Sequence, residues 1–126
     1  MSDRPTADDL LGIARDSVLV ELLPLLPKSA HYTARMVANA LAIARREQAA
    51  TAVCADADAF ATLVILAGGD AAAPASAWAV HLVERIRSGT FDEAPELSRQ
   101  LGDALARWTR ARVAISNPRI LATPAA

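Results

Sequence analysis

Scarce residue types already restrict what this chain can be. Cys54 is the only cysteine among 126 residues, so the chain forms no internal disulfide, and we expect a reducing, cytoplasmic environment. The longest apolar stretch, residues 59–67, is under half of the ~20 residues that span a bilayer. The first residues have no apolar segment like that of a signal peptide. The sequence therefore predicts a soluble protein with no membrane partner.

A large charge of either sign is also lacking. The net charge is -1, which gives no reason to expect a nucleic acid or an anionic membrane as partner. Lys28 is the only lysine, and arginines supply the other cations. Four of these arginines follow Ala104, in a stretch without any acid.

Apolar residues make up 53% of the chain, and aromatic residues only 4%. Alanine supplies much of the apolar share, and an alanine-rich, glycine-poor composition favours closely packed helices over sheets. Apolar spacings of three and four, between capping residues and glycine or proline stops, predict five helices. They are expected at residues 6–23, 29 or 31 to 50, 56 or 58 to 68, 76–88 and 95–115.

These elements predict an all-α, single-domain bundle of about five helices over residues 1–126, with the third helix central. The apolar run in the third helix also fits a buried strand, but its caps and length favour a helix. We expect the connection at residues 22–27 to be buried and Phe91 to plug the core. Residues 1–5 and 122–126 are expected to be flexible tails.

One face of the second helix gives the best indication of a site. Steps of three and four place five residues on one stripe, which are Tyr32, Arg35, Met36, Asn39 and Ile43. Arg35 and Asn39, flanked by His31 and Tyr32, would suit an anion or a carboxylate, because a guanidinium is a planar fork of donors and an amide can donate beside it.

For the same face we favour the alternative of a buried structural network over a ligand site. Arg35 would bind a carboxylate or helix-end carbonyls, and Asn39 would fix the register of the helix. We expect this network to involve the Asn117-Pro118-Arg119 ending, so that the second helix and the end of the chain touch.

A second group of polar residues lies near the C-terminus and consists of Arg107, Arg110, Arg112, Asn117 and Arg119. As a functional surface it would take phosphate, a CoA-like anion, RNA or an acidic partner. The alternative is a solvated helix face, and arginines on different sides of one helix do not form a single patch. Without an aromatic stacking platform, nucleic acid is the less favoured partner.

Motifs for chemistry are missing. His31, His81 and Cys54 are too far apart for a zinc pattern, and Cys54 is more simply a small apolar residue. Gly68-Gly69 lacks the lysine and hydroxyl of a phosphate loop, and no nucleophile elbow is present. We therefore expect no catalytic residue, no metal and no cofactor. A small enzyme with His31 and Tyr32 as acid–base groups is the least favoured alternative.

Three segments, residues 4–11, 32–47 and 112–121, resemble together an uncharacterised bacterial family of small all-helical domains. The residues that are most characteristic of this family correspond in this chain to Arg35, Asn39, Asn117, Pro118 and Arg119. Members of the family occur alone or beside aminoglycoside-phosphotransferase-like kinases and acyl-CoA dehydrogenases. The resemblance implies a helical fold and a link to acyl-CoA metabolism, but it supplies no activity and no catalytic residue.

We expect first a non-catalytic accessory module that binds such a neighbouring enzyme as its protein partner and also forms a homo-oligomer, for example a homodimer. The second expectation is a protein that binds a small anion or acyl-CoA. Its candidate ligand-binding residues are Arg35, Asn39, Tyr32, His31, Asn117 and Arg119.

Overall fold

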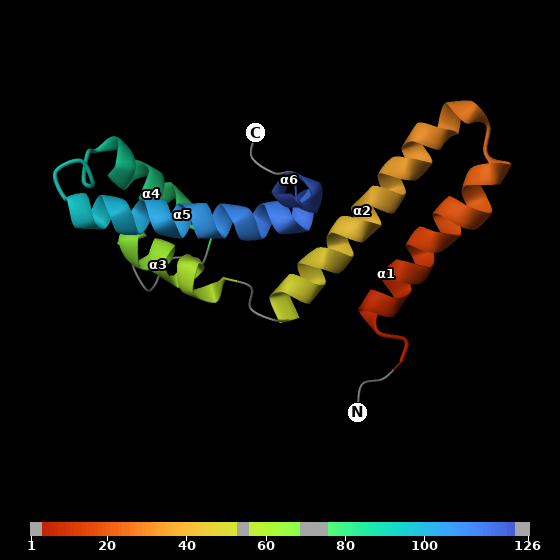
Figure 1. The fold of residues 1–126 in the computed structure, drawn as a ribbon, viewed down its shortest axis with the longest axis horizontal. Coiled ribbons are helices and arrows are strands. Elements are labelled where there is room, and N and C mark those ends of the chain that lie inside the picture. The colour runs from red at the N-terminus through yellow and green to blue at the C-terminus, as the bar shows by residue number, and fades with distance from the viewer. Residues whose placement is uncertain (1–3, 53–55, 69–75, 123–126) are drawn as a thin grey trace. The chain divides into compact units, whose positions relative to one another are not determined.

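The structure is a computed structural model that describes residues 4–52, 56–68 and 76–122. All regular structure in these ranges is helical (Figure 1), so the predicted all-α class is confirmed. The α-helices are α1 (Ala7–Asp16), α2 (Lys28–Ala52), α3 (Ala57–Ala67), α4 (Trp78–Arg87), α5 (Pro95–Ser116) and α6 (Pro118–Ala122).

Contacts divide the chain into two compact units. The first comprises residues 1–55 and 114–119, and the second comprises residues 56–113 and 120–126. One domain over the whole chain therefore stays a prediction. Cys54 and most of the expected flexible tails lie outside the described residues, whereas Ala122 ends α6.

Helix α1 begins where the sequence predicts, at a reciprocal cap. The Asp9 amide donates to the Thr6 hydroxyl at 3.2 Å, and the Thr6 amide donates to Asp9 Oδ2 at 3.0 Å. This pattern satisfies two backbone donors that a helix start leaves open. Asp8 and Asp9 also suit the positive end of the helix dipole.

Pro24 explains how this helix ends. Proline has no amide hydrogen, and its ring clashes with the carbonyl four residues earlier. The chain responds by widening into a π-helical turn, Ser17–Leu22, in which the Leu23 amide donates to the Val18 carbonyl, and then tightens into a 3₁₀ turn, Leu23–Leu25. The prediction that this connection is buried is wrong, because Leu22 is 50% exposed and Leu25 is 81% exposed.

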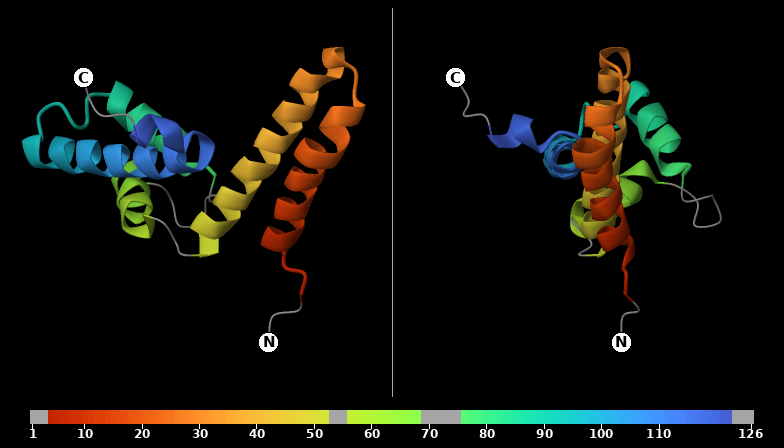
Figure 2. Two further views of the ribbon diagram at one scale, coloured as in Figure 1. Left: turned by 45° about the vertical axis from the view of Figure 1, so that its right-hand side comes forward. Right: turned by 90° about the vertical axis from the view of Figure 1, so that its right-hand side faces the viewer.

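Helix α2 runs back beside α1 to form an antiparallel helical hairpin (Figures 1 and 2). Its buried residues are Ala34 and Ala38, and alanines let neighbouring helices approach closely. The stripe that contains Tyr32 and Met36 does not face a core, since these side chains are 74% and 42% exposed.

One ion pair joins the two helices of the hairpin. Arg45 Nε and Nη2 each donate to one carboxylate oxygen of Asp8, both at 2.9 Å. The hydrogen bonds from Arg45 lower the pKa of Asp8 below its ordinary value of 3.8. Partial loss of solvent around the carboxylate opposes this shift of the pKa, and the charge of Arg45 adds to it. The same pairing raises the pKa of Arg45.

The second unit has its own apolar core, to which α3, α4, α5 and the turn before α5 contribute. Its buried members are Leu63, Leu66, Ala67, Leu82, Phe91, Leu101 and Ala104. Phe91 is 5% exposed, so its predicted role as a core plug is confirmed. The Trp78 ring packs edge-on against Phe60 and against Trp108, with centroids 5.4 and 5.6 Å apart.

The predicted stop of α3 is also confirmed. Gly68 follows the helix with φ of +62°, and its amide donates to the Ile65 carbonyl at 3.0 Å. This left-handed cap favours glycine. At the other end of α3, Asp56 is likewise left-handed, and its carboxylate accepts a 2.6 Å hydrogen bond from Arg107 Nη2.

The core of the second unit depends most on Leu63, which is fully buried at 0% exposed. We predict that Leu63→Ala lowers the free energy of unfolding by about 2–5 kcal/mol, because it removes buried methyl groups and leaves a cavity. Ile65→Ala on the same helix is the matched control, since Ile65 is 76% exposed. This substitution should lower the free energy of unfolding by less than ~0.5 kcal/mol. Urea unfolding followed by circular dichroism measures both, and equal losses would contradict this assignment of the core.

Gly68 and Gly102 should respond to alanine with opposite signs. Gly68→Ala puts a side chain at positive φ and against the guanidinium of Arg85, so we expect a loss of about 1 kcal/mol. Gly102 lies inside α5 with nothing within 4 Å of an added methyl group. Gly102→Ala should therefore raise stability by about 0.5–1 kcal/mol. Urea midpoints of the two variants test this, and a shift of both in the same direction would refute it.

The lowered pKa of Asp8 predicts a pH dependence. A carboxyl group whose pKa is lower in the folded state stabilises the fold fully above its unfolded pKa, and the contribution is lost as the pH falls through the folded pKa. We expect an NMR titration of the Asp8 carboxyl to give a midpoint below 3.8. In Arg45→Gln the midpoint should return toward that ordinary value. Identical midpoints in the two proteins would show that the pair does not form in solution.

Candidate functional site

A cavity of about 660 Å³ lies in the first unit between α1, α2 and the segment that joins α5 to α6. Four arginines line it, together with two asparagines, a serine and small apolar residues. The lining residues are Arg15, Arg35, Ala38, Asn39, Ala42, Arg46, Ser116, Asn117, Pro118 and Arg119. This volume lies within the ~300–1,000 Å³ range of pockets that hold small organic molecules.

One face of α2 builds half of this cavity. Arg35, Asn39, Ala42 and Arg46 follow one another in steps of four, three and four, so a helix places them in one row. Ala42 and the buried Ala38 occupy little space between the long polar side chains. Small residues beside long cationic ones leave the hollow and give it a polar rim.

The segment around residues 115–119 supplies the facing wall. Arg46 Nε donates to the Ile115 carbonyl at 2.6 Å, one of the last carbonyls of α5, which have no acceptor role within the helix. Ser116, Asn117, Pro118 and Arg119 then contribute to the lining. The predicted meeting of the second helix with the end of the chain is therefore seen, although the bond runs through Arg46.

The interpretation of Arg35 and Asn39 as a buried network is wrong. Both are exposed, and no polar or charged residue is buried in the described part of the chain. Their place on α2 explains this, because Ala34 and Ala38 take the inner positions of the helix. Within the described ranges, neither side chain makes a hydrogen bond or an ion pair. Both therefore keep their donors available to a ligand.

His31 and Tyr32 do not join these residues. His31 Nε2 donates to the Leu26 carbonyl at 3.0 Å, so it helps to hold the start of α2, and neither residue lines the cavity. Tyr32 is 74% exposed. The structure thus brings together Arg35, Asn39, Asn117 and Arg119 around the cavity. His31 and Tyr32 lie outside it.

The C-terminal group of polar residues divides in the same way. Asn117 and Arg119 line the cavity, whereas Arg107 is paired with Asp56 in the second unit. Arg112 and Arg119 each interact with other residues, and Arg110 is exposed. The prediction that these arginines form no single patch is consistent with this distribution.

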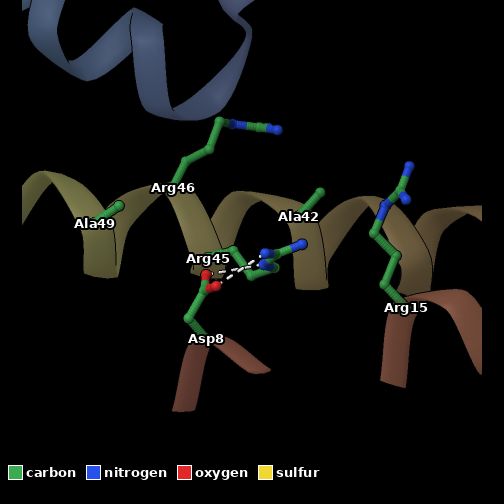
Figure 3. A pocket seen from close by; sticks show the side chains of 6 residues that line it. All are labelled: Asp8, Arg15, Ala42, Arg45, Arg46 and Ala49. Carbon is green, nitrogen blue, oxygen red and sulfur yellow. Dashed lines mark hydrogen bonds and ion pairs between the residues drawn. The ribbon is translucent and has the colours of Figure 1, made fainter. Parts of the chain in front are cut away.

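A smaller cavity of about 330 Å³ adjoins the first and shares Arg15, Ala42 and Arg46 with it. Its other lining residues are Asp8, Arg45 and Ala49. Figure 3 shows the Asp8–Arg45 pair at one side, while Arg46 points away from that pair and Arg15 stands upright at the other end. Asp8 is the only acid that lines either cavity.

The charged residues that line the larger cavity are therefore all arginines. None of its lining residues is an acid, and Arg15 pairs at 3.6 Å with Asp16, which lies outside the lining, through exposed side chains. Exposed pairs of this kind are weak. An anion that enters would meet several guanidinium groups, which bind carboxylate and phosphate in a forked geometry.

Other kinds of site receive no support from the described residues. No group of three or more histidine, cysteine or acidic side chains there is close enough to hold a metal ion. Among the helices of the described ranges, none has the length and apolar character to cross a membrane.

Sequence reasoning missed Arg15, Arg46 and Ser116. Arg46 was detectable, because it lies seven residues after Asn39 and so continues the same helical row; its neighbours Arg45 and Glu47 made it look like part of a solvated end. Arg15 could not be recognised from the sequence as a cavity residue, because its position depends on how α1 packs against α2.

Comparison with known proteins gives one family. The family model described as a domain of unknown function, DUF6285, matches residues 24–120. The matched segment contains α2 and the ending that together line most of the cavity. No curated protein and no solved structure matches the chain. Because the family model covers more than half of the sequence, the chain belongs to the DUF6285 family.

Proposed function

We propose that this protein binds a small organic anion, with a phosphate or carboxylate group, in the arginine-lined cavity. The observation that carries the proposal is a hollow of about 660 Å³ lined by Arg15, Arg35, Arg46 and Arg119 without an acid. Free inorganic phosphate would leave most of such a volume empty, so an organic anion is the better match.

Each polar residue has a role in this proposal. Arg35 and Asn39 are the first contacts for the anion, since both are exposed and neither has another partner within the described chain. Arg46 is held by the Ile115 carbonyl through Nε, which leaves its terminal nitrogens to face the ligand. Asn117 adds an amide from the opposite wall. No side chain is assigned a catalytic role.

A second proposal concerns a protein partner. The turn of the helical hairpin exposes large apolar side chains, among them Val20 at 72%, Leu25 at 81% and Tyr32 at 74%, and exposed apolar patches are typical of interaction surfaces. The resemblance to domains found beside acyl-CoA dehydrogenases and phosphotransferase-like kinases makes such an enzyme the first partner to test, in a bacterial cytoplasm. An acyl-CoA is correspondingly one organic anion to include among ligands.

The ligand proposal is tested by thermal unfolding and calorimetry with citrate, AMP, ribose 5-phosphate and acetyl-CoA. A ligand present at 100 times its Kd stabilises the fold by about 2.7 kcal/mol, so at least one compound should raise the melting temperature by several degrees. Arg35→Gln should weaken that binding about 10- to 100-fold, because a charge-assisted hydrogen bond contributes about 1.5–3 kcal/mol. Failure of all four compounds with the wild-type protein would contradict the proposal.

Arg110→Gln is the matched control, because Arg110 is also an exposed helical arginine but lies in the second unit and outside both cavities. It changes the net charge by the same amount as Arg35→Gln. Equal weakening by the two variants would show that the protein attracts anions only through its overall charge.

A further inference from the structure

The two adjoining cavities differ in the charge that they offer. The larger one has arginines without a lining acid, whereas the smaller one contains the carboxylate of Asp8. Arg15, Ala42 and Arg46 belong to both linings, so the two cavities lie next to each other. A ligand long enough to occupy both would meet cations at one end and an acceptor at the other.

Asp8 keeps the capacity to accept a further hydrogen bond. A carboxylate has about four acceptor positions, and Arg45 uses one on each oxygen. The Asp8 side chain is still 53% exposed. The pairing also fixes its position, because two parallel hydrogen bonds hold the carboxylate in one orientation.

The same pairing balances the charge of Arg45. Because Asp8 and Arg45 compensate each other, the smaller cavity attracts an anionic group only through Arg15 and Arg46, which also line the larger cavity. A neutral group that carries hydroxyl donors can donate to the remaining acceptor positions of Asp8. Ala42 and Ala49 also line this cavity, and their methyl groups can contact the carbon skeleton of such a group.

From this geometry we infer the class of the ligand: a hydroxyl-rich phosphate ester of about sugar size. Its phosphate lies in the larger cavity near Arg35 and Asn39, and its hydroxyl-bearing part lies in the smaller cavity, where Asp8 accepts a hydrogen bond. This inference rests on the proposed anion binding and adds the polarity of the rest of the ligand. Asp8 is a specificity residue, whereas Arg35 is an affinity residue.

The test compares two phosphate esters with the same number of carbon atoms, of which only one carries hydroxyl groups. Ribose 5-phosphate and n-pentyl phosphate both have five carbons and one phosphate, and calorimetry with the full chain gives the Kd of each. We expect the wild-type protein to bind ribose 5-phosphate at least 10-fold more tightly. Asp8→Ala should bring the ratio of the two constants close to one. Equal Kd values for the two probes in the wild-type protein would overturn the inference.

Arg45→Gln separates the acceptor from the ion pair. It breaks the same pair as Asp8→Ala but keeps the carboxylate, so the preference for ribose 5-phosphate should remain. Loss of the preference in both variants would show that the pair shapes the cavity and that Asp8 does not contact the ligand, which overturns the inference. Far-UV circular dichroism and the melting temperature show that both variants are folded.

Arg35→Gln keeps the two proposals distinguishable. It should weaken the binding of both phosphate esters by a similar factor and leave the ratio of their Kd values unchanged. If neither phosphate binds the wild-type protein while citrate does, anion binding stands and the assignment to phosphate esters fails. If no anion binds at all, the proposed function itself fails.

Discussion

The small side chains on the inner side of α2 determine much of the first unit. Ala34 and Ala38 are the buried positions of this helix, and an alanine face lets α1 come close without large apolar side chains between the helices. Nothing bulky then fills the space beside Ala38 and Ala42. The long arginines of the two helices stand around this space, and the cavity is the result.

The electrostatics of the hairpin depend on which arginine has a partner. Arg45 is matched by Asp8 through two hydrogen bonds, and this pair connects α1 to α2. Arg46, the next residue, turns to the Ile115 carbonyl and joins α2 to the segment 114–119. Arg45 and Arg46 are consecutive residues, and they therefore connect α2 to two different segments, α1 and residues 114–119. Arg35, another arginine of the cavity lining, makes no hydrogen bond or ion pair within the described residues.

The sequence was sufficient for the parts of the fold that local chemistry decides. Thr6, Gly68 and Pro95 mark helix ends because capping and backbone geometry depend on neighbours in sequence. The sequence was not sufficient to predict which residues of α2 are buried, because the faces of an alanine-rich helix differ little in hydrophobicity. Arg35 and Asn39 were recognised as unusual but were assigned to the interior, and Arg15 was missed because only tertiary packing brings it to them. The π-helical turn before Pro24 also has no local signature beyond the proline itself.

The position of the aromatic residues has a spectroscopic consequence. Trp78 and Trp108 are the only two tryptophans, and both pack against the core of the second unit. The single tyrosine, Tyr32, is on α2 in the first unit. Indole emission is therefore an intrinsic reporter of the second unit alone, whereas the far-ultraviolet signal comes from the helices of both. Comparing the two signals during unfolding separates the events in one unit from those in the other without any added label.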